Sequence, residues 1–320
     1  MHVRRGFINW GIFLICVGAV PLAVQLNVID RETAASLLRL WPLVLIGIGL
    51  GLLLRFTRAQ ALGGLVVAAT FGVLVGVFFA AGFPSAAGVC SGDQTGSPIT
   101  RNGTVSGSLD LQVELTCGEM TVSRAPGGVW SVDVRAGNET PVIDAKGNTL
   151  ELRSVTAERW PFGSDERESW QVVVPSESSL SGSLTVNAGT LNATLGNGPI
   201  GALNATYNAA EGRIDLTGTN PATFNGTLNA STIDLILPSA AFNGSITINA
   251  ATLELCVAPD VGLRITYDDT LSSQNFAAAG LAQSGKTWQS ANYGSATARA
   301  ELHISANVST TTLNPAGGCQ

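Results

Sequence analysis

The chain has 320 residues, and only 12% of them are charged, about half the share found in an ordinary soluble protein. Up to Phe83, six Lys and Arg stand against two Asp and Glu, a balance of +4. After Phe83, eleven stand against twenty-one, a balance of −10. This composition excludes one uniform soluble domain, and it indicates two parts of different chemistry.

Three long apolar runs fill the first part of the chain, over about residues 6–26, 37–54 and 59–83. A helix rises 1.5 Å per residue, so each run is long enough to cross ~30 Å of hydrocarbon. We therefore predict that residues 1–83 form a transmembrane anchor of three helices.

The basic residues of the short loops predict how this anchor is oriented. Arg4 and Arg5 precede the first run, and Arg55 and Arg58 lie between the second and third runs. Basic residues in short loops are retained on the cytoplasmic side of a membrane. We expect a multi-pass protein with a cytoplasmic N-terminus, which places residues 84–320 outside the cytoplasm.

Two segments of the apolar part carry a more specific pattern. Residues 10–14 read Trp-Gly-Ile-Phe-Leu, and residues 40–47 read Leu-Trp-Pro-Leu-Val-Leu-Ile-Gly. This pair of segments resembles the membrane region of LiaF-like and LiaI-like bacterial cell-envelope proteins. The resemblance implies a protein of the bacterial cell membrane.

A short repeat is the main feature of the second part. An asparagine followed by alanine recurs at steps of 21, 21 and 20 residues, at Asn187, Asn208, Asn229 and Asn249. A unit of this length cannot close its own core, so it must stack its apolar row on its neighbours. We predict an all-β domain over residues 105–313, a single-stranded β-solenoid with rungs of about 20 residues. A β-sandwich is the alternative fold.

We assign a structural role to the four repeated asparagines. Side-chain amides stacked at one position of each rung can hydrogen-bond to one another, which fixes the register. Binding of sugar or metal is the alternative role for this row. However, amides alone are weak metal ligands, and no Asp, Glu or His accompanies them in register. We predict no metal site and no cofactor.

The segments around the repeats carry a second resemblance. Shorter strands are predicted before the repeats, and a tail with recurring Gly and aromatic residues follows them. These are residues 111–122, 129–134, 149–152 and 170–174, and then Asn275, Phe276, Gly280, Leu281, Gly285, Trp288 and Tyr293. The arrangement resembles the adhesin-like "toastrack" β-solenoid family, although family rungs more often carry Gly-Asp where this chain has Asn-Ala. Residues 84–104 are then a linker, and residues 314–320 are a C-terminal tail.

One segment matches the expression for a phosphate-binding loop. Residues 280–287 read Gly-Leu-Ala-Gln-Ser-Gly-Lys-Thr, so Gly280, Gly285, Lys286 and Thr287 would hold a nucleotide. A working loop needs a buried strand before it and a helix after it. The flanking residues here are small and polar, so we interpret the match as false.

Catalytic groups are sparse in the predicted extracytoplasmic part. His303 alternates with apolar neighbours and is expected on the solvent face of a strand. Glycosidases use paired carboxylates without histidine, which makes Asp268 with Asp269 and Asp165 with Glu166 the pairs to weigh. Adjacent carboxylates on a turn point apart, so we predict no catalytic site and no enzyme.

The cysteines suggest an oxidising compartment. Four of the five, Cys90, Cys117, Cys256 and Cys319, follow the predicted anchor. An even number outside the membrane favours two disulfides, and three pairings remain open. Cys90 with Cys117 and Cys256 with Cys319 would close the shorter loops, whereas four independent thiols are the other interpretation.

The sequence therefore predicts a protein that acts through its surface. By its resemblance to the two families named above, the leading hypothesis is an accessory protein for envelope-stress sensing, regulation or scaffolding, with membrane lipid and other membrane proteins, such as a sensor kinase, as partners. An adhesin or structural surface module is the second hypothesis, and a carbohydrate-active enzyme is the third. A cell-wall component is a further candidate partner, and no nucleic acid is expected. The glycine pairs Gly47 with Gly51 and Gly72 with Gly76 would let helices approach closely, so a homo-oligomer stays possible.

Overall fold

The computed structural model describes residues 11–19, 22, 49, 67–73, 96–137, 140–154 and 167–318. The chain divides into two compact units, Met1–Pro84 and Ser85–Gln320. The two units are described separately below, and the predicted boundary near Phe83 falls beside the boundary between them.

The described residues of the first unit are all helical, in the segments 11–19 and 67–73 and at positions 22 and 49. Among the described residues, no helix combines the length and the apolar character needed to cross a bilayer.

This finding corrects the predicted fold class. The prediction of a three-helix transmembrane anchor was wrong as a description of the structure. It relied on the length of apolar runs, which is a property of composition, and it assumed that each run is one continuous helix. Most residues of the expected helices (6–26, 37–54 and 59–83) lie outside the described part of the chain.

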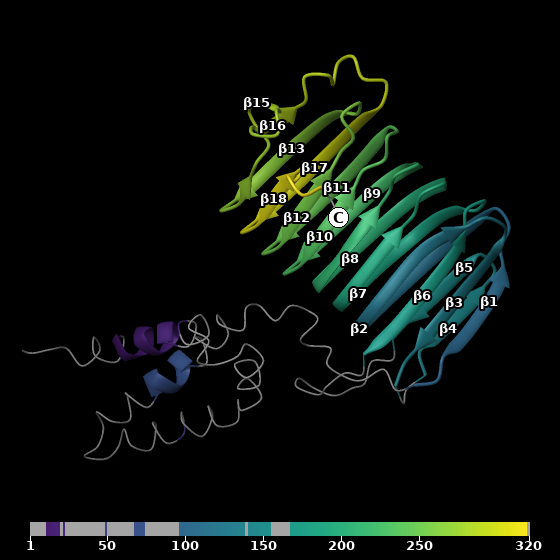
Figure 1. Ribbon diagram of the computed structural model, residues 1–320, viewed down its shortest axis with the longest axis horizontal. Coiled ribbons are helices and arrows are strands. Elements are labelled where there is room, and N and C mark those ends of the chain that lie inside the picture. The colour runs from purple at the N-terminus through teal and green to yellow at the C-terminus, as the bar shows by residue number, and fades with distance from the viewer. Residues whose placement is uncertain are drawn as a thin grey trace, which may run out of the picture. The chain divides into compact units, whose positions relative to one another are not determined.

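The second unit is a stack of rungs, each made of two strand segments that meet at a corner (Figure 1). We call the sheet of first segments face A and the sheet of second segments face B. Three long strands run through both faces, and later rungs use one strand for each face. The long strands are β2 (Ser108–Ala125), β7 (Ser179–Thr194) and β8 (Gly198–Asp215), followed by β9 (Thr219–Asn229) with β10 (Thr232–Ile236) and β11 (Phe242–Asn249) with β12 (Thr252–Cys256).

Successive rungs pair in parallel at the period of the repeat. On face A, Thr185 lies opposite Thr206, Thr206 lies opposite Thr227, and Thr227 lies opposite Thr247. On face B, β8 pairs in parallel with β10, and β10 with β12. The sandwich considered as an alternative is built from antiparallel sheets, and these pairs do not have that pattern.

Short strands close the N-terminal end of the stack. β5 (Thr149–Arg153) and β6 (Glu168–Pro175) pair in parallel with the two halves of β2. β4 (Val142–Lys146) then pairs antiparallel with β5, β3 (Val129–Arg135) with β6, and β1 (Ile99–Thr104) with β3. β1 lies inside the segment that the sequence suggested as a linker.

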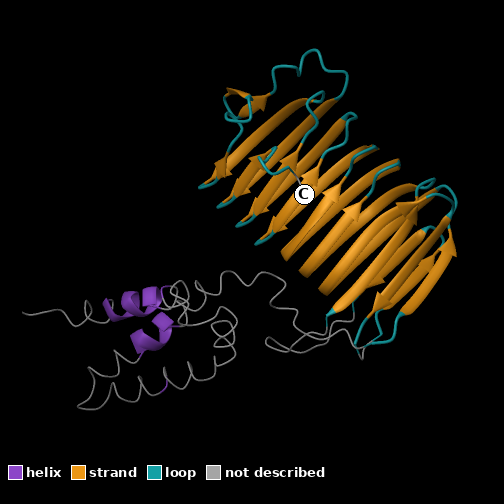
Figure 2. Cartoon of the chain, in the orientation of Figure 1, coloured by secondary structure: helices purple, strands orange, loops and turns teal. Residues whose placement is uncertain are grey.

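The C-terminal end of the stack departs from chain order. β13 (Gly262–Thr270) and β14 (Ser273–Gln274) form the outermost rung, and β17 (Arg299–Asn307) and β18 (Thr310–Leu313) lie between that rung and the β11/β12 rung. The hairpin of β15 (Ala282–Ser284) and β16 (Thr287–Gln289) pairs antiparallel with β13. Strands cover both faces of the unit from end to end (Figure 2).

The inward-facing residues of both faces form one core. Alternate positions of each strand point inward, and Leu191, Ile214, Leu235 and Leu255 are each no more than 1% exposed. Burying one such side chain contributes about 1.5–3 kcal/mol. The apolar row of the repeat is therefore what holds neighbouring rungs together.

The corners between the faces require an unusual backbone. Ala230, Ala250, Leu271 and Val308 all lie at corners with φ between 48° and 54°, a region that residues other than glycine rarely adopt. The corner amides join one rung to the next, because Ala230 N–H donates to the carbonyl oxygen of Asn249 and Ala250 N–H donates to that of Asn307, each at 2.9 Å.

Candidate functional site

The outer surface of face A is a grid of polar side chains. Residues that alternate with the core positions point outward and line up in rows from rung to rung. One row carries Thr185, Thr206, Thr227, Thr247 and Ser305, and the neighbouring row carries Ser183, Asn204, Asn225, Ser245 and His303. Most of this grid is uncharged because the repeat places threonine and asparagine at these positions.

The repeated asparagines lie beside this grid, at the corner, and form a continuous chain of hydrogen bonds. The Nδ2 atom of each donates to the Oδ1 atom of the asparagine one rung earlier, at 2.7 Å for Asn208 to Asn187, 3.0 Å for Asn229 to Asn208 and 2.9 Å for Asn249 to Asn229. Each bond fixes the register of two rungs.

The ladder has a fifth member that the sequence period did not reveal. Asn307 donates to Asn249 at 3.0 Å, across 58 residues of chain. The local signal is weaker there, because Ser305-Ala306-Asn307-Val308 has Ser and Val in place of the Thr and Ala of the repeat. The interval of 58 residues hid it, since β17 returns from the outermost rung to occupy this place.

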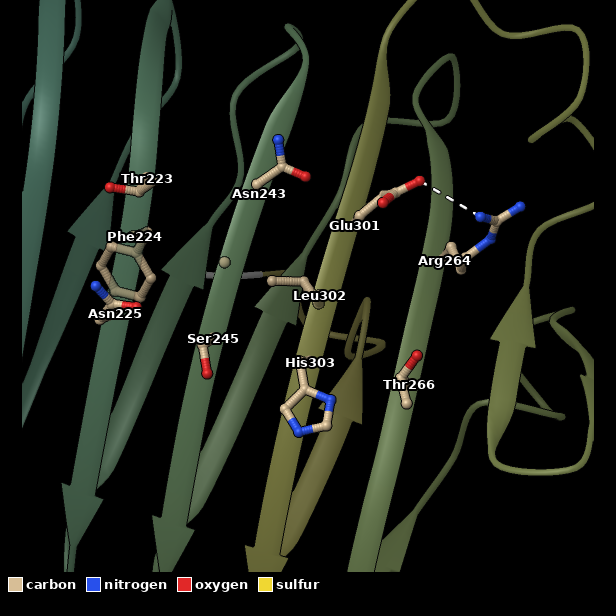
Figure 3. A pocket seen from close by; sticks show the side chains of 11 residues that line it. Thr223, Phe224, Asn225, Asn243, Ser245, Arg264, Thr266, Glu301, Leu302 and His303 are labelled. Atoms are coloured by element: carbon tan, nitrogen blue, oxygen red, sulfur yellow. Dashed lines mark hydrogen bonds and ion pairs between the residues drawn. The ribbon is translucent and has the colours of Figure 1, made fainter.

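A groove of about 350 Å³ opens on face A where β9, β11, β17 and β13 lie side by side (Figure 3). Asn225, Ser245, His303 and Thr266 form one row across these four strands. A second row holds Thr223, Asn243, Glu301 and Arg264, whereas Phe224, Gly244 and Leu302 complete the lining from inward positions.

The wall of the groove at β17 and β13 carries charge, and the charges are paired. Arg264 Nη1 lies 3.4 Å from Glu301 Oε1, and the Arg264 guanidinium lies 4.0 Å above the ring of Tyr293. The Tyr293 hydroxyl donates to the Glu301 carboxylate, and this bond, together with burial, raises the pKa of Tyr293.

A second charged group adjoins the groove. Lys286 donates to Asp268, and this bond lowers the pKa of the Asp268 carboxyl and raises the pKa of the Lys286 amine. Asp268 also lies 3.8 Å from Nε2 of His303, whose side chain is 55% exposed. His303 is therefore on the solvent face, where its alternation with apolar residues placed it.

The residues of the false phosphate-loop match lie in a β hairpin. Gly280 precedes β15, Gly285 is in the turn, and Thr287 begins β16, which pairs antiparallel with β13. The Lys286 amine forms an ion pair with the Asp268 carboxylate. A strand, and not the helix that a phosphate loop requires, follows this segment.

The structure describes only some of the remaining predicted positions. Asp268 points outward from face A next to Lys286, while Asp165 and Glu166 lie outside the described residues. Cys117 and Cys256 are disulfide-bonded, and Cys16 is a free thiol. Cys90 and Cys319 lie outside the described part, so the pairing stays a prediction. The described ranges contain no cluster of three or more His, Cys, Asp or Glu that could hold a metal ion.

Comparison with known families identifies one segment. Residues 9–53 match the LiaI-LiaF-like transmembrane region. The match confirms the resemblance seen at residues 10–14 and 40–47, and it associates this part of the chain with a membrane. It covers only a minor part of the chain, and no curated protein matches.

Several solved structures of bacterial proteins described as adhesins or cell adhesion proteins are similar to this chain. A "putative cell adhesion protein" from Clostridium sporogenes is 14% identical, with a TM-score of 0.45, over 68% of this chain and 99% of its own. A "putative adhesin" from Bacteroides fragilis is 11% identical, with a TM-score of 0.27, over 68% and 97%. One from Parabacteroides distasonis is 9% identical, with a TM-score of 0.26, over 69% and 98%.

Proposed function

We propose that the protein is a non-enzymatic component of a bacterial cell envelope that attaches to the membrane through its N-terminal unit. Its β unit acts outside the cytoplasm in envelope-stress sensing, regulation or scaffolding. The observation that carries this proposal is the match of residues 9–53 to the LiaI-LiaF-like transmembrane region, in a compact unit separate from the stack of rungs.

The construction of the β unit supports a role in presenting a surface. The amide ladder links five rungs, and the parallel pairs hold successive members of each outer row about 4.8 Å apart. The carboxylates beside the groove are held by partners, Glu301 by Arg264 and Tyr293, and Asp268 by Lys286. Such a face suits recognition of an extended partner better than turnover of a substrate.

In this proposal the two units have different partners. The N-terminal unit contacts lipid and other membrane proteins, such as a sensor kinase, and the β unit faces the cell wall or the cell surface. Transfer of a signal between them requires both units in one chain. Removal of the β unit should therefore separate signalling from membrane attachment.

The test is a strain in which residues 99–318 are deleted and residues 1–98 are kept. We expect the deletion to change the response to cell-wall antibiotics, measured with an envelope-stress reporter, while the truncated protein stays in the membrane fraction. A reporter response equal to that of the full chain, at equal protein level, would contradict the proposal.

Adhesion is a second candidate function. It is favoured by the extended uncharged rows on the outer surface of face A. In this case the same deletion reduces attachment of cells to a surface or to other cells and leaves the stress reporter unchanged. Measuring both responses in the same strain decides between the two functions.

A further inference from the structure

The groove on face A combines several kinds of polar group. Within one hollow it combines amides of Asn225 and Asn243, the hydroxyl of Ser245, the imidazole of His303 and the Arg264–Glu301 pair (Figure 3). Amides, hydroxyls and neutral imidazole can each both donate and accept hydrogen bonds. A ligand that suits them offers donors and acceptors side by side, as the hydroxyl groups of a sugar do.

The charges of the groove disfavour ionic ligands. The positive charge of Arg264 is matched by Glu301, and that of Lys286 is matched by Asp268. A site for phosphate or for an acidic polymer would show unmatched basic groups. The pairing on face A leaves no such excess among the residues that line the groove.

The apolar surface of the groove is too small for an apolar peptide or a lipid chain. Phe224 and Leu302 contribute to the lining, but each is only 3% exposed. Grooves that bind apolar segments present exposed hydrophobic anchors. Recognition here must depend on hydrogen bonds from the outward rows.

The groove also continues into a longer track. From β11 towards the N-terminal end of the stack, the row of Ser245 and the neighbouring row of Thr247 keep hydroxyl or amide groups through β9, β8 and β7, whereas the row of Asn243 reaches Ala202 on β8. Neighbouring rungs repeat about every 4.8 Å. A chain laid across the strands would therefore meet similar groups at each rung, which favours a polymer over a single small molecule.

We propose that this groove and the adjoining rows of face A bind an uncharged polysaccharide laid across the strands. Asn243 and Ser245, both exposed on β11, form the centre of the site, and His303 and the Arg264–Glu301 pair bind its end at β17 and β13. The inference rests on the proposed function, because it requires the β unit to lie outside the cytoplasm, where such polymers occur.

The experiment uses the full chain in lipid nanodiscs and measures binding by isothermal titration calorimetry. The probes are chitohexaose and cellohexaose, which are uncharged, and polygalacturonate, which is anionic. We expect at least one uncharged probe to bind, with an affinity that is independent of salt because no net charge is neutralised.

The variant that tests the site is the double substitution Asn243→Ala with Ser245→Ala. It should weaken binding of the uncharged probe about tenfold or more, the loss expected when two hydrogen bonds are removed. The matched control is Thr232→Ala with Thr252→Ala, a pair of outward residues on face B that lie opposite each other. The control should bind as the unchanged chain does.

Three results would overturn the inference. These are no binding of either uncharged probe, tighter binding of polygalacturonate that weakens with salt, or equal binding by the groove variant and the control. Circular dichroism shows whether each variant keeps its strands. A groove variant that loses the polysaccharide while the cellular stress response persists separates this inference from the proposed function.

Discussion

The regular rungs and the C-terminal rungs share the same corner geometry and parallel register, but they follow one another along the chain in different orders. From β7 to β12, consecutive segments stack at offsets of 20 or 21 residues, and their outward rows on face A are uncharged. At the C-terminal end, β17 fills a place between β11 and β13, and charged pairs appear on face A. Corner geometry and parallel register are thus requirements of the stack, and succession along the chain is not.

A tight steric requirement in the regular rungs lies at the corner glycine Gly189. Gly189 has φ of 121°, and an added Cβ would lie 1.9 Å from the carbonyl oxygen of Gly118. Gly285, in the β15–β16 turn, has φ of 60° and open space around it. We expect Gly189→Ala to lower the free energy of unfolding by at least about 4 kcal/mol, because both strain and a backbone clash result.

Gly285→Ala is the matched control and should cost only about 1 kcal/mol, since it adds backbone strain without a clash. Chemical denaturation followed by circular dichroism measures both variants. Equal losses for the two glycines would show that the regular corners are no tighter than the terminal turn.

The second comparison places one core substitution in each region. Ile246 on β11 and Ile304 on β17 lie opposite each other and are 1% and 0% exposed. Ile246→Ala and Ile304→Ala should each lower the free energy of unfolding by about 2–4 kcal/mol. The losses should be similar because both side chains occupy the same core.

The kinetics should separate these two isoleucines. β11 pairs with β9 across about 20 residues, whereas β17 pairs with β11 across 58 residues of chain. Long loops close later in folding, so Ile246→Ala should slow folding and Ile304→Ala should mainly speed unfolding. Stopped-flow measurements that give the reverse division would show that the C-terminal rung forms first.

The same contrast explains what could be predicted from the sequence. The period of Asn187, Asn208, Asn229 and Asn249 sufficed to predict strands, inward rows and the order of the regular rungs, because each pairs with its neighbour in the chain. Asn307 was missed because its partner is 58 residues away. The groove was missed for the same reason, since it needs Glu301 and His303 brought next to β11.

The prediction for the apolar N-terminal part was wrong for a different reason. Apolar composition fixes what a segment is soluble in, but it does not fix where a helix begins and ends. The family match of residues 9–53 supports the predicted association with a membrane. The prediction of three spanning helices was wrong, because no helix among the described residues could cross a membrane.

A smaller effect is expected from the ladder. Asn229 donates to Asn208 and accepts from Asn249, whereas Asn307, at the C-terminal end of the ladder, only donates to Asn249. Asn229→Ala should therefore lower the free energy of unfolding by about 1–2 kcal/mol, and Asn307→Ala by about half as much. Urea denaturation measures the two variants. A larger loss of unfolding free energy for Asn307→Ala would mean that the rung of β17 and β18 depends more on the ladder than the regular rungs do.

The smallest expected effect concerns the charged pair that distinguishes the C-terminal rungs. Lys286 lowers the pKa of Asp268, so the pair stabilises the fold above the ordinary pKa of an aspartate and loses this contribution as pH falls through the lowered value. The pKa of Lys286 is raised, so the contribution is also lost as pH rises through that higher value. Both side chains are exposed, at 75% and 36%, and such pairs contribute little.

Lys286→Met should thus destabilise the β unit slightly at neutral pH, and the difference from the unchanged chain, followed by thermal melting across pH, should vanish in acid. Asp268→Asn should match the neutral-pH loss, while a difference that persists in strong acid would assign the effect of Lys286 to packing of its aliphatic stem.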